Sequence, residues 1–178
     1  MKSLTLLRHA KSGWDDPVSR DFDRPLNPRG RRAARTIGQA MKAEGLAFDL
    51  VLASPACRVT GTLEEVEAVY GPLHPHFDRR LYLASTATLL EIVRSAPDEA
   101  ERLLLAGHNP GLEEIALRLS RRDGAGLRGQ IEVKYPTGTL AEIELPVGHW
   151  AEVEEGRGLI VRFIRPRDLD PELGPDSE

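Results

Sequence analysis

Residues 1–14 read MKSLTLLRHAKSGW, and the leucine-rich run Leu4–Leu7 ends directly at Arg8 and His9. A short apolar run of this kind is typical of a strand buried on both faces of an α/β sheet. Arginine keeps its charge in proteins, whereas histidine titrates near neutral pH. The stretch therefore predicts a strand over residues 3–7 that presents two ionisable side chains at its carboxyl end.

Length and composition restrict the class of protein. The 178 residues are enough for one domain with a sizeable core. A net charge of −4 argues against a general nucleic-acid-binding protein, and no apolar run approaches the length of about 20 residues that spans a membrane. The N-terminus does not have the pattern of a signal peptide, and a single cysteine fits a reducing compartment. We therefore expect a cytoplasmic protein that binds neither nucleic acid nor membrane.

Strand and helix patterns alternate along the chain. Apolar runs predict strands, and Asn-Pro or Ser-Pro pairs followed by apolar residues at helical spacing predict helix starts. The expected strands are 3–7, 49–53, 74–77, 102–106, 140–145 and 159–164, and the expected helices begin at Asn27-Pro28, Ser54-Pro55, Ser85 and Asn109-Pro110. This alternation predicts an α/β fold with a mostly parallel sheet covered on both faces, and an antiparallel pair from the last two strands at one edge.

Two segments stand outside this pattern. Residues 121–130 form a polar loop with glycines, which is either a cover over a site or an irregular connection. The stretch DPELGPDSE at 170–178 is acidic and nearly free of apolar residues. We therefore expect one domain over residues 1–166 and a loose acidic tail over 167–178.

Ionisable side chains follow three of the expected strands. Arg8 and His9 end the first strand, Arg58 lies just after the second, and His108 follows the strand at 102–106. Ligands of open α/β sheets bind at the carboxyl ends of the strands, where helix N-termini also carry partial positive charge. Two arginines and two histidines at this edge predict a site for a compact dianion such as phosphate.

The residue types suit phosphoryl transfer. Guanidinium groups bind phosphoryl oxygens in a bidentate manner and neutralise their charge. A neutral imidazole can accept a phosphoryl group and so divide hydrolysis into two steps. His9 is the better candidate for the nucleophile because a strand end sets its direction, which leaves His108 as the electrostatic partner. Thr62 lies four residues after Arg58 on the same helix face, within reach of the site.

Each signal also has an ordinary structural explanation. An Arg-His pair is often solvated surface, Arg58 alone could be a salt-bridged helix residue, and His108 could belong to a turn. His74 and His76 could share a metal, although packing is the simpler explanation. The run Arg29, Arg31, Arg32 and Arg35 could face an acidic partner protein or form the solvated side of a helix. Only the combination of three strand ends with compatible chemistry favours a site.

Three segments resemble the signature segments of a known family. LLRHAKS, SPACRVTGT and AGHNPG are similar to those of the histidine phosphatase superfamily, which has the phosphoglycerate-mutase-like fold. RHAKS, DFDRPLNPRGRRAA and YPTGTLAEIEL further resemble the SixA-type phosphohistidine phosphatases. The resemblance implies a three-layer α/β/α sandwich and a phosphohistidine intermediate on His9. It also implies a phosphate pocket of Arg8, Arg58 and His108, a polar contact from Thr62, and no metal or other cofactor.

The sequence departs from many relatives at one place. Mutases and broad-range phosphatases of the superfamily carry an acidic proton donor in a segment that here reads Leu81–Ser85, without a carboxylate. Trp14 is expected to wall the site, and the proton donor remains unassigned. The candidate donors, for each of which solvated surface or helix N-terminal charge is the simpler explanation, are Asp15, Asp16, Asp21, Asp23, Glu113 and Glu114.

The missing carboxylate bears on the substrate. An alkoxide leaving group needs a proton because its conjugate acid is about as weak as water, with a pKa of ~15.7. Phosphohistidine protonated on its free ring nitrogen instead releases a neutral imidazole, whose conjugate acid has a pKa of ~6.5. We therefore expect a protein phosphohistidine phosphatase, monomeric in the simplest case. The alternatives are a phosphatase of a small phosphorylated metabolite and a non-catalytic phosphate- or partner-binding module.

Overall fold

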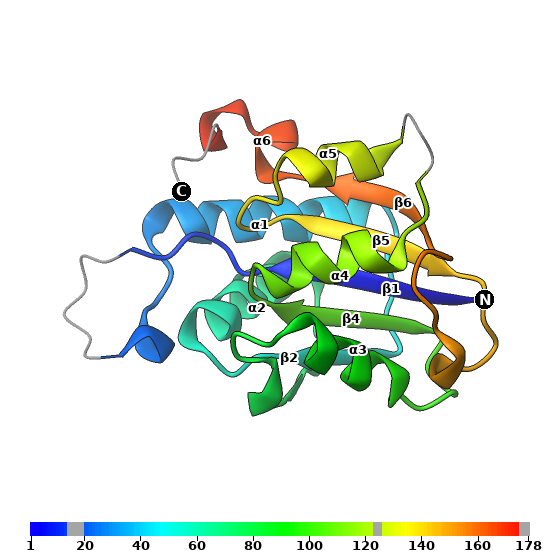
Figure 1. The fold of residues 1–178 in the computed structure, drawn as a ribbon. Coiled ribbons are helices and arrows are strands. Elements are labelled where there is room, and N and C mark those ends of the chain that lie inside the picture. The colour runs from blue at the N-terminus through cyan, green and yellow to red at the C-terminus, as the bar shows by residue number, and fades with distance from the viewer. Residues whose placement is uncertain (14–19, 123–125, 175–178) are drawn as a thin grey trace.

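The computed structural model describes residues 1–13, 20–122 and 126–174. A six-stranded sheet with the order β3-β2-β4-β1-β5-β6 forms its centre (Figure 1). The strands are β1 (Lys2–Arg8), β2 (Leu50–Ala53), β3 (His76–Phe77), β4 (Arg102–Gly107), β5 (Leu140–Leu145) and β6 (Leu159–Ile164). The helices are α1 (Pro28–Ala43), α2 (Cys57–Tyr70), α3 (Thr86–Arg94), α4 (Gly111–Leu119), α5 (Leu127–Val133) and α6 (Pro166–Leu169).

Strand β1 lies at the centre of this sheet. It runs parallel to β4, with Arg8 opposite Gly107, and antiparallel to β5, with Leu7 opposite Leu140. Strands β2 and β3 extend the parallel part, whereas β6 pairs with β5 in antiparallel fashion at the far edge. The predicted mostly parallel sheet with an antiparallel pair at one edge is confirmed.

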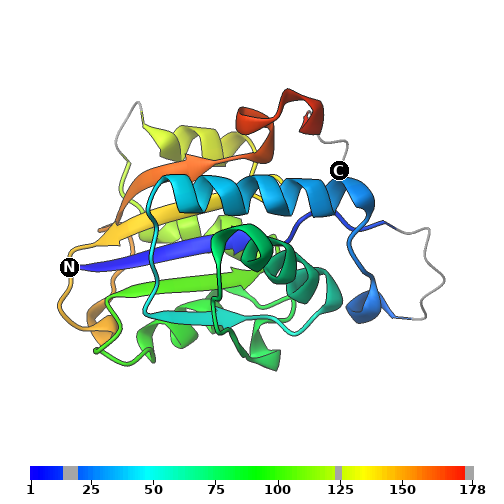
Figure 2. The same ribbon diagram turned by 180° about the vertical axis from the view of Figure 1, so that it is seen from behind.

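Helices cover both faces of the sheet. Figure 1 shows α3, α4 and α5 in front of the strands, and the view from behind in Figure 2 shows α1 and α2 on the opposite face. Successive strand residues point to opposite faces, so Leu6 packs beneath α3 and α4 while Leu7 packs beneath α1 and α2. The fold is the three-layer α/β/α sandwich that the family resemblance implies.

The helix starts agree with the sequence in part. Asn27 caps α1 as expected, because its side chain accepts a hydrogen bond from the backbone N–H of Gly30. Helix α2, however, begins at Cys57 after Ala56, so Ser54-Pro55 is not its cap. The Ser54 hydroxyl instead lies 2.8 Å from Nε2 of His108.

Helix α1 lies very close to the segment that follows β1. A Cβ atom at Gly30 would be 2.0 Å from the carbonyl oxygen of Lys11, so only glycine fits at this position. The backbone N–H of Asn27 donates to the same carbonyl. The start of α1 is thus built directly on the chain that leaves the His9 strand.

Two expectations about irregular segments are corrected. Helix α5 (Leu127–Val133) begins inside the expected 121–130 loop and continues beyond it, and residues 123–125 lie outside the described part. The segment expected as a loose tail continues the fold to Gly174, with Leu173 buried in a 3-10 turn. Arg32 of α1 forms ion pairs with Asp170 and Glu172, so these two acidic residues are bound rather than free. Residues 175–178 lie outside the described part.

Among the described helices, none combines the length and the apolar character needed to cross a bilayer.

Candidate active site

A cavity of about 510 Å³ opens at the carboxyl ends of β1 and β4. Arg8, His9, Arg58 and His108, which come from three separate segments, all line it. The predicted meeting of these four side chains at one sheet edge is therefore present in the structure. The full lining is Arg8, His9, Lys11, Ser12, Asp21, Arg24, Arg58, Leu83, His108 and Asn109.

His9 is held by its backbone and by one ring nitrogen. Its N–H donates to Gly107 at 3.1 Å, and its carbonyl accepts from the N–H of Gly138 at 2.8 Å. Nδ1 of the ring lies 2.7 Å from the carbonyl oxygen of Ala10. Because a carbonyl can only accept, Nδ1 carries the proton, and Nε2 keeps its lone pair. That tautomer is the nucleophilic one.

His108 lies beside His9 on the loop after β4. The centroids of the two rings are 5.3 Å apart. Nε2 of His108 contacts the Ser54 hydroxyl at 2.8 Å, and its buried Nδ1 has no hydrogen-bond partner in the described part of the chain.

Both imidazoles are neutral at neutral pH. Burial lowers the pKa of His9 to about 3, and the nearby charges of Arg8 and Arg58 act in the same direction. Burial, followed by the charge of Arg58, lowers the pKa of His108 to about 3 as well. A bound phosphoryl dianion would raise both pKa values because an opposite charge favours the protonated form.

The two arginines are oriented by carbonyl oxygens. Arg8 donates from Nη1 to the carbonyl of Tyr135 at 2.9 Å. Arg58, whose side chain is 3% exposed, donates from Nη1 to the carbonyl of Asp21 and from Nη2 to its carboxylate, each at 2.9 Å. Nε of Arg58 is buried and has no partner among the described residues. Orientation by such fixed acceptors reduces the entropy lost when an anion binds.

Asp21 is the acidic residue that lines the cavity. Besides Arg58, Arg24 donates to its carboxylate at 2.9 Å and the Tyr82 hydroxyl donates at 2.6 Å. Burial acts to raise the pKa of Asp21, but the hydrogen bonds from Tyr82, Arg58 and Arg24 lower it to about 2. Asp21 is therefore ionised at neutral pH and holds no proton to donate.

The other candidate proton donors lie elsewhere. Asp23 pairs with Arg20 on the surface, and Glu114 accepts a hydrogen bond from Thr86. Glu113 is also absent from the cavity lining. Trp14, Asp15 and Asp16 lie outside the described residues.

Thr62 supports the site from beneath. Its hydroxyl donates to the carbonyl of Arg58 at 2.7 Å and accepts from the N–H of Ala10 at 2.8 Å. Thr62 is buried and does not line the cavity. Both hydrogen bonds of its hydroxyl go to the backbone and connect α2 to the residue after His9. Thr62 therefore does not occupy the expected position for a contact with substrate.

The comparisons with known proteins agree with this geometry. Residues 4–82 match the family model described as "Histidine phosphatase superfamily (branch 1)". An uncharacterized protein of Mycobacterium tuberculosis is 37% identical over 163 residues, which cover 90% of this chain and 100% of that protein. The chain belongs to the histidine phosphatase superfamily.

Solved structures place this histidine phosphatase beside the SixA proteins. A putative SixA phosphohistidine phosphatase from Nakamurella multipartitia is 26% identical with a TM-score of 0.80, over 93% of this chain and 96% of that chain. The putative SixA from Agrobacterium tumefaciens is 27% identical with a TM-score of 0.76, over 93% and 98% of the two chains. The fold and the enzyme class, a phosphatase, are therefore shown.

Sequence reasoning missed several residues of this histidine phosphatase's site. Arg24 lies in the DFDRPLNPRGRRAA segment and Tyr82 in the Leu81–Ser85 segment, but neither was expected to contact Asp21. The contact of Tyr82 with Asp21 forms only when distant parts of the chain meet in the fold. Ser54 was interpreted as a helix cap. Lys11, Ser12 and Asn109 also line the cavity, and their only sequence signal is proximity to the strand ends.

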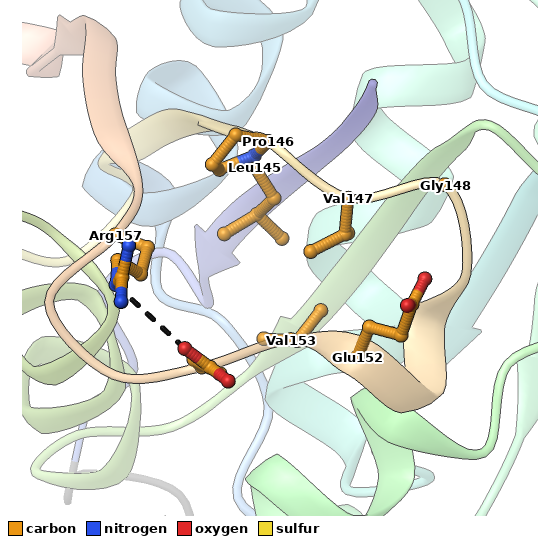
Figure 3. A pocket seen from close by; sticks show the side chains of 8 residues that line it. Leu145, Pro146, Val147, Gly148, Glu152, Val153 and Arg157 are labelled. Carbon is orange, nitrogen blue, oxygen red and sulfur yellow. Dashed lines mark ion pairs between the residues drawn. The ribbon is translucent and has the colours of Figure 1, made fainter.

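A second hollow, of about 330 Å³, lies at the opposite end of the sheet (Figure 3). It is lined by Leu145, Pro146, Val147, Gly148, Glu152, Val153, Glu154 and Arg157, none of which lines the cavity at the carboxyl ends of β1 and β4. Arg8, His9, Arg58 and His108 line the cavity at the carboxyl edge of the sheet and none of them lines this second hollow.

No group of three His, Cys, Asp or Glu side chains among the described residues is arranged to hold a metal ion.

Proposed function

We propose that this phosphatase hydrolyses phosphohistidine on a protein, with His9 as the nucleophile. One observation carries the proposal. The hydrogen bond from Nδ1 of His9 to the Ala10 carbonyl leaves an unprotonated Nε2 in a cavity that contains two arginines. An uncharged nucleophile beside fixed cations is what attack on a phosphoryl dianion requires.

The reaction divides into two displacements. In the first, Nε2 of His9 forms a bond to phosphorus while the P–N bond to the substrate histidine breaks, and the substrate leaves as a neutral imidazole. In the second, the oxygen of a water molecule bonds to phosphorus, the P–Nε2 bond breaks, and inorganic phosphate leaves. Arg8 and Arg58 neutralise the phosphoryl oxygens in both steps, and Nδ1 of His108 is free to meet the same group.

The state of Asp21 supports a P–N substrate. A carboxyl with a pKa of about 2 is not a general acid at neutral pH. Protonated phosphohistidine needs no such acid because its leaving group departs uncharged. We infer that Thr62 acts as a positioning residue and that Asp21 orients Arg58.

A phosphatase of a small metabolite is the second candidate. It is favoured by the same carboxylate, since a substrate dianion beside Asp21 would raise its pKa and allow it to protonate an alkoxide. The two candidates differ in how strongly the rate depends on the leaving group.

A substrate panel tests the proposal. Purified protein with EDTA would be offered a phosphohistidine peptide, p-nitrophenyl phosphate and an alkyl phosphomonoester. We expect turnover of the first two and a kcat/KM for the alkyl ester at least about 10²-fold lower, the scale of a missing general acid. Equal turnover of the alkyl ester would reject phosphohistidine as the preferred class. Vanadate binding without turnover of any substrate would reject catalysis.

A further inference from the structure

A basic hollow lies next to the catalytic cavity. It is formed between the start of α1, the residues before β5 and the start of α6, which lie side by side in Figures 1 and 2. Its cationic residues are Lys11, Arg29, Arg165 and Arg167, and its other residues are Ala33, Pro136, Thr137, Pro166 and Leu173. No carboxylate lines it, and Lys11 lines the catalytic cavity as well.

Backbone contacts connect the residues around the hollow to His9. The N–H of Gly138, one residue after the lining residue Thr137, donates to the carbonyl of His9. Pro166 packs on Gly138, where an added Cβ atom would be 3.0 Å from its ring. Helix α1 begins against Lys11, as described above. The basic hollow therefore has a set position relative to His9.

The arginines of α1 are not equivalent. Arg32 pairs with Asp170 and Glu172, Arg35 pairs with Glu65, and Arg31 donates to the carbonyl of Leu26. These three are thus engaged within the molecule. Arg29 is exposed, faces the hollow and forms no hydrogen bond or ion pair with any described residue.

The start of α6 shows the same contrast. Arg165 pairs with Asp168, which lies beside the hollow. Arg167 forms no ion pair or hydrogen bond in the described part of the chain. Arg29 and Arg167 are therefore the two guanidinium groups at the hollow that remain open to a partner's charge.

The size of the hollow indicates what it can bind. A volume of about 20 Å³ holds about one water molecule, so it does not enclose a small-molecule ligand. Side chains of a protein that lies across the surface can still reach its charged rim. The whole chain carries a net charge of −4, so this cationic hollow differs in sign from the chain as a whole and attracts acidic side chains locally.

We propose that the basic hollow docks an acidic segment of the protein substrate next to the phosphorylated residue. This inference rests on the proposed function and specifies how that substrate is selected. Carboxylates of the segment pair with Arg29 and Arg167 while the phosphoryl group enters the adjoining cavity. Docking of this kind lowers KM and leaves the chemical step unchanged.

The test compares two phosphohistidine peptides that differ only in their flanks, one with Asp and Glu and the other with Asn and Gln. For the wild-type protein at low ionic strength we expect kcat/KM to be about tenfold higher for the acidic peptide, through KM. In the double variant Arg29→Gln/Arg167→Gln the ratio should fall to about one. Because the ratio is measured within one preparation, partial unfolding of the variant does not change it.

A matched control removes two charges elsewhere. Arg118 and Arg157 pair with Glu155 and Glu154 at the opposite end of the sheet, and Arg157 with its ion pair is visible in Figure 3. Arg118→Gln/Arg157→Gln changes the net charge equally and should keep the tenfold preference. Equal loss in both double variants, or no preference in the wild type, would overturn the docking surface and leave the proposed function intact. Turnover of p-nitrophenyl phosphate with neither peptide hydrolysed would overturn the proposed function and the docking surface with it.

Discussion

The imidazole rings of His9 and His108 lie 5.3 Å apart at an interplanar angle of 56°. Each ring is buried beside arginines, and each has a pKa lowered to about 3. The two neutral rings differ in how their nitrogens are bonded. His9 presents a lone pair because its other nitrogen is bound to Ala10, whereas His108 is anchored through Ser54.

Replacement of the nucleophile should abolish turnover. We expect His9→Ala to lower kcat for p-nitrophenyl phosphate by at least about 10³-fold, because the covalent route is removed and only binding and charge stabilisation remain. The exposed His149, which pairs with Asp98, provides the control, and His149→Ala should keep wild-type activity. Mass spectrometry of acid-sensitive phosphoenzyme should locate the phosphoryl group on residue 9. Substantial turnover by His9→Ala would remove this residue from the nucleophile role.

The buried histidines should make stability depend on pH. In the unfolded chain each ring has a pKa of about 6.5 and is protonated below that pH. In the folded protein the pKa of each ring is about 3, so the ring stays neutral down to a much lower pH. Between these values the unfolded state holds more protons, so the free energy of unfolding falls as the pH falls. From pH 7 to pH 5 we expect a loss of about 2 kcal/mol per ring. In urea titrations, His108→Asn should lose about half of this dependence, and an unchanged dependence would contradict the burial of a neutral ring.

Asp21→Asn separates the two candidate substrate classes. The variant keeps an acceptor near Arg58 but holds no acidic proton. For a phosphohistidine peptide we expect kcat to fall by less than about tenfold, because the leaving imidazole needs no general acid. A loss of about 10² to 10⁴-fold on that peptide would identify Asp21 as a general acid and favour the metabolite phosphatase.

Thr62 links stability to catalysis. In Thr62→Val the buried N–H of Ala10 loses its acceptor, which costs about 1 to 3 kcal/mol. Because Ala10 also accepts the His9 Nδ1–H, kcat should fall together with the melting temperature. Thr62→Ser keeps both hydrogen bonds and should restore kcat. If Thr62→Val lowered the melting temperature but kept full kcat, the positioning role would be wrong.

Much of the fold could be predicted because burial leaves a periodic pattern. The predicted bounds of the last two strands, 140–145 and 159–164, are those of β5 and β6. Helix α5 was missed because its seven residues contain Gly129 and leave little apolar periodicity. The segment up to Gly174 was misjudged because its acidic residues suggested disorder, whereas Arg32, some 140 positions away, pairs with Asp170 and Glu172.

The site could be predicted where local sequence determines geometry. Strand ends bring Arg8, His9 and His108 to one edge by topology alone. The hydroxyl of Tyr82 meets the carboxylate of Asp21 across 61 positions, and no local pattern encodes that contact. Ser54 shows a different failure, since the same Ser-Pro signal suits a helix cap and a histidine partner equally.

The contact of Gly30 with the Lys11 carbonyl has a consequence for how this enzyme can change. Even one methyl group at position 30 would push against the chain that leaves the nucleophile, since the added carbon would be 2.0 Å from that oxygen. Arg29, the preceding residue, is exposed, lines the basic hollow and is absent from the lining of the catalytic cavity. On the proposed docking, two adjacent positions have separate roles, because position 30 preserves the geometry of the site and position 29 selects the substrate. Substitutions at position 29 are then expected to change substrate preference without changing the chemical step.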